Sequence, residues 1–263
     1  MIDRRLTGAG AAALCVLAAS ACSDTTGPGA TDRVAVRFAA VTPAPAQGSV
    51  EGSSLELTGS NGTLRIDEMY FIVAEFELEG DDDVCDLNFN DDDCEEFEAP
   101  PAFLDVPLDG SGVIAVQHTV PAGTYHELDF EIEDLDDDDE DDSAKAQQIA
   151  DMRTQILAQF PDWPRDASIL VVGSFTPTGG SPLPFRVYFE AEIEIEMDLV
   201  PPVVIDGTGS SPAFTVRIDP DMLFRNGDGT VRNLAPLDFT LTGQVIEFEV
   251  EIENGVSEIE FDD

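Results

Sequence analysis

The sequence predicts an all-β fold, with one antiparallel β-sandwich or two, and one inserted amphipathic helix. Apolar and acidic residues alternate with period two in several segments, which is typical of strands with one buried and one solvated face. Glycine and proline, with 21 and 17 occurrences among 263 residues, separate these segments as turn residues do. A single segment instead has apolar residues at helical spacing. Together these patterns favour packed sheets over an α/β arrangement.

The strands are predicted from their alternation. It is clearest in residues 125–133, where Leu128, Phe130 and Ile132 are separated by acidic residues, and residues 190–199 repeat it. In residues 239–253 the apolar parity switches, so a strand with a bulge near residues 243–246 is expected there. The remaining predicted strands are residues 34–41, 54–57, 64–79, 113–120, 168–175 and 214–218.

The helix is expected to begin near Ser143, a residue type that caps helices, and to end before Pro161. Its apolar residues recur at intervals of three and four: Ile149, Met152, Ile156 and Phe160. An acidic run at residues 136–142 precedes it, where the helix dipole favours negative charge. Trp163, the sole tryptophan, is expected to be a hydrophobic plug at the helix end; the alternative is a ligand platform.

The chain start carries two basic residues, Arg4 and Arg5, and then an apolar stretch over residues 9–19 that is too short to span a bilayer. The stretch ends in Ala19-Ser20-Ala21-Cys22. This pattern resembles a bacterial lipoprotein signal peptide. The resemblance implies cleavage before Cys22, lipid attachment to Cys22, and export to the cell envelope, at the outer membrane or cell surface. An ordinary secretory signal cut near Ala21 and an uncut membrane anchor are the alternatives.

These features predict a five-part organisation. Residues 1–21 are a signal peptide, 22–33 a flexible tether, 34–134 a β-sandwich domain, 135–167 the acidic run with the helix, and 168–263 a second sandwich or the second half of one.

Two cysteines remain in the folded part, Cys85 and Cys94. Because an exported chain matures in an oxidising compartment, we expect a disulfide that closes a short loop. A metal site is the alternative, but the pair has no CxxC motif and no neighbouring histidine.

The loop between these cysteines is a candidate calcium site. Asp86, Asn88 and Asn90 have the one, three, five spacing of an acidic calcium loop. Asp91 replaces the glycine at the sixth position and Phe97 occupies the twelfth, so this is no EF-hand. The alternative is a solvated acidic hairpin tip. The candidate metal ligands are Asp86, Asn88, Asn90, Asp91, Asp92 and Glu95.

The charge balance is extreme, with 55 acidic against 12 basic residues and a formal net charge of −43. Nucleic acid is excluded as a natural partner because no basic patch could contact its phosphates. Neighbouring strands place carboxylates about 5 Å apart, where two of them repel by about 0.8 kcal/mol in water and about 3 kcal/mol at a dielectric of 20. Calcium, high ionic strength or a strand order that separates the acidic stripes would relieve this. The stripes lie in residues 75–79, 127–133, 190–198, 247–253 and 258–260.

The motif Pro121-Ala122-Gly123-Thr124-Tyr125 predicts a tight turn that leads into a strand. This P-A-G-x-Y turn resembles a group of uncharacterised bacterial surface lipoproteins with prealbumin-like or immunoglobulin-like sandwiches, and also carboxypeptidase-regulatory-like domains. The resemblance covers residues 64–133 and implies a fold and no catalytic residues.

The function expected from these observations is a non-catalytic binding or structural role in a lipid-anchored exported protein, with calcium as the ligand. The sequence has no GxSxG, no HExxH and no phosphate-binding glycine loop. His118 and His126 could meet across the Pro121 turn to bind a metal, but exposed hairpin residues are the favoured interpretation. Two alternatives stay open: a module that adheres to an extracellular protein or carbohydrate, and a secreted hydrolase with a carboxylate pair.

Overall fold

The computed structural model describes residues 31–41, 48–51, 54–80, 96–135, 143–208, 213–247 and 256–262. The predicted signal peptide, most of the tether and the Cys85–Cys94 loop lie outside these residues. The strands are β1 (Thr31–Ala40), β2 (Gly48–Glu51), β3 (Ser54–Gly59), β4 (Gly62–Val73), β5 (Glu75–Gly80), β6 (Glu96–Ala99), β7 (Ala102–Asp105), β8 (Val113–Pro121), β9 (Gly123–Ile132), β10 (Ile169–Pro177), β11 (Leu183–Glu190), β12 (Ile193–Ile205), β13 (Ala213–Ile218), β14 (Ile246–Glu247) and β15 (Val256–Asp262). The helices are α1 (Ser143–Gln159), α2 (Pro220–Phe224), α3 (Phe239–Thr242) and the 3-10 turn η2 (Ala235–Leu237).

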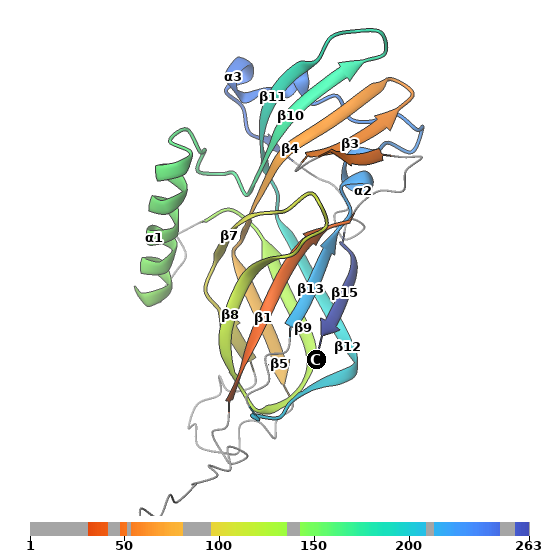
Figure 1. Cartoon of the computed structure of the whole chain (residues 1–263). Coiled ribbons are helices and arrows are strands. Elements are labelled where there is room, and N and C mark those ends of the chain that lie inside the picture. The colour runs from red at the N-terminus through yellow and green to blue at the C-terminus, as the bar shows by residue number, and fades with distance from the viewer. Residues whose placement is uncertain are drawn as a thin grey trace, which may run out of the picture.

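These strands form three sheets, which confirms the all-β fold class. Sheet A has the order β15-β13-β1-β8, sheet B the order β14-β11-β10-β4-β3-β2 with β7 beside β4, and sheet C the order β12-β9-β5-β6. In Figure 1, sheet B lies above, and β1 and β13 of sheet A lie in front of β5 and β9 of sheet C. Most pairs are antiparallel, but β1 pairs with β13 and β11 with β14 in parallel, so sheets A and B are mixed.

Every sheet combines strands from both sides of helix α1. β1 pairs with β13, β4 with β10, and β9 with β12. The buried apolar residues of all three sheets form one continuous core. Phe38 of β1 meets Phe130 of β9 edge to face, with ring centroids 5.4 Å apart, and so joins sheets A and C. The strands on the two sides of helix α1 are thus joined by strand pairing and by side-chain packing.

Residues 64–79 are not one strand as predicted. They form β4 in sheet B and β5 in sheet C, and the change occurs at Ala74, whose N–H donates to the Glu131 carbonyl of β9. The apolar run from Met69 to Val73 is buried throughout. One side of the run faces the main core; on the other side Tyr70 faces a layer of aromatic residues and Ile72 faces helix α1. Period two therefore fails there, and the strand changes partners.

Helix α1 begins at Ser143, where the helix was expected to start, and its last residue is Gln159. Ile149 and Ile156 are buried, whereas Met152 is partly buried beside them. After the helix, Trp163 packs against Phe160 with ring centroids 5.8 Å apart, in the position expected of a plug. The helix thus covers the outer side of sheet B next to β7 (Figure 1).

The predicted strand over residues 239–253 is wrong at its start. Residues Phe239–Thr242 form the short helix α3, because the Asp238 side chain accepts a hydrogen bond from the N–H of Thr240 and caps it. Gly243 ends the helix in the left-handed conformation, with φ of 63°. Of the expected strand, the structure describes only β14 at residues 246–247. Local capping here outweighs the apolar pattern.

We predict that Gly173→Ala destabilises the fold. A Cβ at Gly173 would lie 2.0 Å from the Arg65 carbonyl oxygen of the paired strand, so the backbone would have to shift. Overpacking of this kind costs about 1 to 3 kcal/mol, measurable by urea unfolding. Gly227→Ala is the matched control, because a Cβ there meets nothing within 4 Å; equal stability of the two variants would contradict the described register.

Candidate cation-binding face

Three of the acidic stripes lie side by side on the outer side of sheet C. The central strand, β9, pairs with β12 on one side and with β5 on the other. We call the resulting surface the acidic face. Its cross-strand rows are Glu75–Glu131–Glu194, Glu77–Asp129–Glu196 and Glu79–Glu127–Asp198. Strand β6 extends the middle row, because Glu98 lies opposite Glu77.

The alternation that forms these rows is set by the burial of apolar residues on the other side of the sheet. Phe76, Leu78, Leu128 and Phe130 point inward and are all at most 2% exposed. Burial of each such side chain contributes about 1.5 to 3 kcal/mol, whereas a carboxylate pair about 5 Å apart repels by about 0.8 kcal/mol in water. Burial therefore decides the register. The repulsion remains as a cost that dissolved ions can lower.

Electrostatic strain on this face is visible in the pKa values of its central strand. The pKa of Asp129 is raised by desolvation and then by Glu194, Glu196 and Glu75. Desolvation and carboxylate neighbours also raise the pKa of Glu131 and of Glu127. Oδ1 of Asp129 is buried, and among the described residues it has no hydrogen-bond partner. Each of these groups would be stabilised by a proton or another cation.

One corner of the acidic face has the geometry of a cation site. Glu75, Glu77 and Glu98 can each place a carboxylate oxygen within 4.8 Å of the others. The chain's only lysine, Lys145, reaches this corner from the first turn of α1. Its Nζ lies 3.2 Å from Glu75 Oε1 and 3.0 Å from Glu98 Oε1. Helix dipoles disfavour a cation in the first turn, so attraction to the acidic face accounts for the position of this ammonium group.

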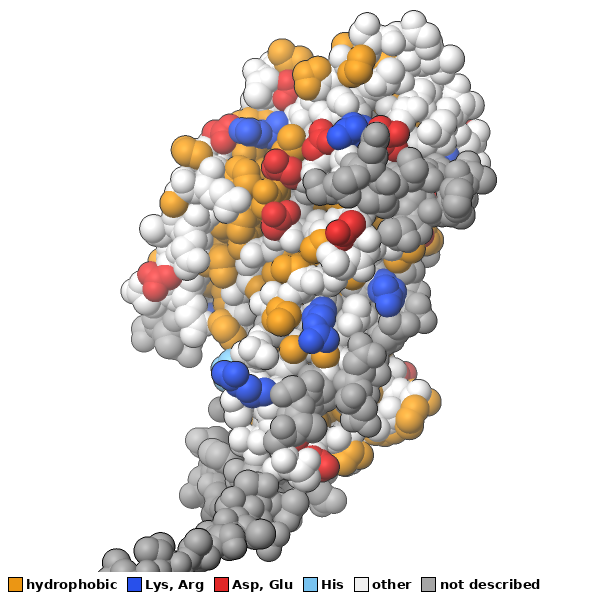
Figure 2. All heavy atoms as spheres, in the orientation of Figure 1, with side chains coloured by type: hydrophobic (Ala, Val, Ile, Leu, Met, Phe, Trp, Pro, Cys, Tyr) orange, Lys and Arg blue, Asp and Glu red, His pale blue; other side chains and the backbone are white. Residues whose placement is uncertain are grey.

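The other predicted acidic stripes lie elsewhere. Glu247 is in β14 at the edge of sheet B, and Glu258 and Glu260 are in β15 of sheet A. In Figure 2, which views the molecule from the side of sheet A, the acidic and basic side chains occur singly rather than in rows. Among the described residues, the cross-strand rows of carboxylates thus lie on sheet C.

The structure also places the two histidines that could have met across the Pro121 turn. His118 is in β8 of sheet A and packs near Phe97, with ring centroids 5.1 Å apart. His126 is in β9 of sheet C, and its Nε2 lies 4.0 Å from Glu79 Oε2. The two histidines therefore belong to different sheets, and His126 borders the acidic face.

The residues predicted as ligands from sequence cannot be compared with this corner. The predicted lipid site Cys22, the predicted disulfide Cys85–Cys94 and all six candidate calcium ligands lie outside the described residues: Asp86, Asn88, Asn90, Asp91, Asp92 and Glu95. The sequence analysis did not predict that Glu98 and Lys145 pair at this corner. The available signal was the presence of a single lysine in a chain with 55 acidic residues.

Comparisons with protein-family models, curated proteins and solved structures found no match to this chain, so the two family resemblances remain predictions. None of the described helices is long and apolar enough to cross a membrane.

We predict that Asp129→Asn stabilises the protein at pH 7 in low salt by about 1 kcal/mol, the size of one close like-charge interaction. Because the raised pKa of Asp129 favours its protonation in the fold, the wild type gains stability as the pH falls from 7 toward that raised pKa. The difference between the proteins should therefore shrink over that range. Urea unfolding measures both effects.

Salt supplies the second check on this variant. At about 1 M NaCl the screening length is about 3 Å, and the gain should disappear. Asp166→Asn is the control, because Asp166 is an exposed residue off the acidic face. A gain of the same size in the control, or in high salt, would contradict repulsion as the cause.

Proposed function

We propose that this chain is an exported, lipid-anchored protein of the cell envelope with a non-catalytic role, and that its acidic face binds cations, with calcium as the principal one. The observation that carries the proposal is the alignment of three carboxylate rows across β12, β9 and β5. Lipid attachment at Cys22 supplies the membrane partner, and the negative surface disfavours nucleic acid.

Calcium suits this face because it is a hard cation that prefers carboxylate oxygens in flexible arrangements. The corner formed by Glu75, Glu77 and Glu98 offers such oxygens at mutual distances within 4.8 Å. Glu98 is about half exposed, and Glu75 has a relative exposure of 28%. Such an open site corresponds to the weak extracellular class, with dissociation constants of about 0.1 to 1 mM.

Lys145 competes with calcium for this corner. Its ammonium group pairs with two of the three glutamates, and these partners raise the pKa of Lys145 against the opposing effect of burial. The corner therefore carries one built-in positive charge. We propose that Lys145 reduces the repulsion between the carboxylates of the acidic face at low calcium. Bound calcium would reduce this repulsion further along the remaining rows.

The two alternative functions have less support. A carbohydrate-binding module needs aromatic rings free to stack on sugars, whereas Trp163 packs edge to face against Phe103 and Tyr188 with ring centroids 5.2 Å apart. A hydrolase with a carboxylate pair needs its acids in a pocket, whereas those of sheet C stand on an open strand surface.

The calcium proposal predicts a higher melting temperature in millimolar calcium chloride at low sodium chloride. Calcium at about ten times its dissociation constant should stabilise the fold by about 1.4 kcal/mol. Glu77→Gln should reduce this gain, whereas Glu190→Gln, an exposed glutamate of β11, should keep it. Without calcium, Lys145→Met should have a lower melting temperature than the wild type. Calcium should raise the melting temperature of this variant by more than that of the wild type. No calcium effect in the wild type, or an equal loss in both glutamine variants, would reject the acidic face as the site.

The anchoring proposal predicts that Cys22→Ala abolishes lipid labelling and releases the protein from the membrane fraction. The measurement is incorporation of a labelled fatty acid in a bacterial host, followed by fractionation. Cys15→Ala is the control, because Cys15 lies within the predicted signal peptide and should leave labelling intact. Labelling that persists in Cys22→Ala would refute the lipoprotein assignment.

A further inference from the structure

An exposed apolar segment lies at one end of sheet C, in the second half of β12. Val200 and Val204 are 87% and 64% exposed, and Pro201 and Pro202 between them are exposed as well. We call these four residues the apolar tip. Single hydrophobic residues on a surface need no explanation, whereas a contiguous group indicates an interaction site.

The apolar tip continues the outward side of β12 beyond its acidic residues. Pairing with β9 runs as far as Asp198; the register then shifts, and pairing resumes at Val203. Val203 and Ile205 are buried in the core. Because successive side chains of a strand point to opposite faces, Val204 is held outward between them. Burial of its neighbours therefore keeps this apolar residue at the surface.

The tip lies at the end of the fold where β1 begins. The first residue of β1 pairs with Pro121, and the turn after Pro121 leads to Gly123, which pairs with Ile205 of β12. Asp32 joins the two strands directly, because its buried Oδ2 accepts a hydrogen bond from the N–H of Gly207 at 2.9 Å. This is the lower end of the molecule in Figure 1, opposite sheet B, and Figure 2 shows exposed apolar side chains there.

The proposed lipid site is tied to the same end by a short length of chain. Thr31, where β1 begins, follows Cys22 by nine residues. A fully extended chain spans at most about 3.3 to 3.6 Å per residue, so this segment reaches no farther than about 30 Å. A lipid on Cys22 would therefore keep the lower end of the fold near the membrane and leave sheet B farther from it.

We propose that the apolar tip inserts into the surface of the lipid bilayer that holds the Cys22 lipid, as a second membrane contact. This inference rests on the proposed lipid attachment and is independent of calcium. One lipid chain alone gives reversible binding, and apolar side chains at an interface enter the boundary of headgroups and acyl chains by about 5 to 10 Å. The tip can enter this layer while Asp198 and Asp206, exposed on either side of it, stay among the hydrated headgroups.

The test uses the lipidated full chain from a bacterial host, reconstituted in phosphatidylcholine vesicles with brominated acyl chains and a calcium chelator. Zwitterionic lipid is used because the net charge of −43 opposes binding to anionic lipid. Val200→Trp places a fluorescent reporter in the tip. Leu241→Trp is the matched control, because Leu241 is 77% exposed in α3, which contacts β11 of sheet B.

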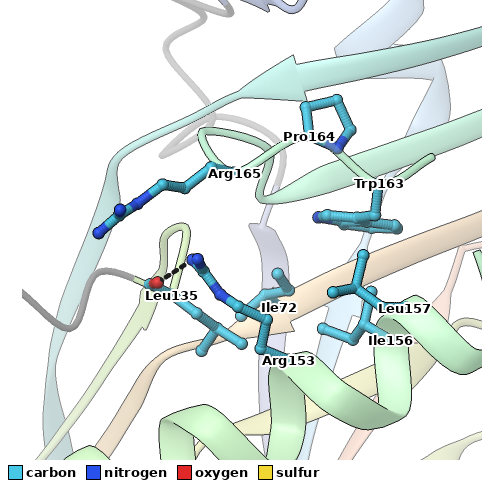
Figure 3. A pocket seen from close by; sticks show the side chains of 8 residues that line it. All are labelled: Ile72, Leu135, Arg153, Ile156, Leu157, Trp163, Pro164 and Arg165. Atoms are coloured by element: carbon cyan, nitrogen blue, oxygen red, sulfur yellow. Dashed lines mark hydrogen bonds between the residues drawn. The ribbon is translucent and has the colours of Figure 1, made fainter. Parts of the chain in front are cut away.

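Bromine quenches a tryptophan only on close contact with the acyl chains. Compared with unbrominated vesicles, Val200→Trp should lose about half of its added fluorescence, because the tip reaches the acyl-chain boundary. Leu241→Trp should lose none. The native Trp163 should also be unaffected, since it lies in the wall of a pocket next to helix α1, on the side of sheet B (Figure 3).

A second substitution tests whether the apolar character of the tip matters. Val204→Asp combined with Val200→Trp should reduce the quenching at least two-fold, because a carboxylate is costly to remove from water. Met222→Asp in the same background should leave the quenching unchanged, since Met222 is an exposed residue of α2, which lies beside β3 (Figure 1). The melting temperature of each variant checks its folding.

The outcomes separate the tip from the anchor. A wild-type protein that does not float with the vesicles would refute the lipid anchor and the tip together. A protein that floats, but in which Val200→Trp is quenched no more than Leu241→Trp, would overturn the tip alone. A blue-shifted emission of Val200→Trp without quenching would also overturn it, because the tip would then be covered by another copy of the chain rather than by lipid.

Discussion

The strand alternation of sheet C is the constraint on which the rest of the structure depends. Inward residues such as Phe130 are fully buried, and the same backbone geometry sends Asp129 and Glu131 outward into rows of carboxylates. Burial contributes more per residue than one exposed like-charge pair costs in water. The fold therefore tolerates the acidic face, at a cost that depends on the ions around it.

Helix α1 contacts two different parts of the molecule. At its first turn Lys145 pairs with Glu75 and Glu98 of the acidic face. Two turns later Arg153 borders the pocket beside sheet B. The chain's only lysine thus lies among the carboxylates of sheet C.

Periodicity predicted much of this fold because it reports on local burial. The stripes of β5, β9 and β12 and the helix from Ser143 follow from it directly. Their adjacency does not, since strand order depends on contacts distant in sequence, such as Lys145 with Glu75. Residues 239–242 were misassigned because the Asp238 cap overrides an apolar pattern.

The most direct test of the central claim is to follow the individual carboxyl carbons by NMR across pH in low salt. Asp129, Glu127 and Glu131 should titrate above the ordinary range of about 3.9 to 4.3, because desolvation and neighbouring carboxylates raise their pKa values. Asp228, whose pKa is lowered by hydrogen bonds from Thr230, should titrate below that range. If Asp129 titrated at or below Asp228, the carboxylates of sheet C would not be crowded, and the account would be contradicted.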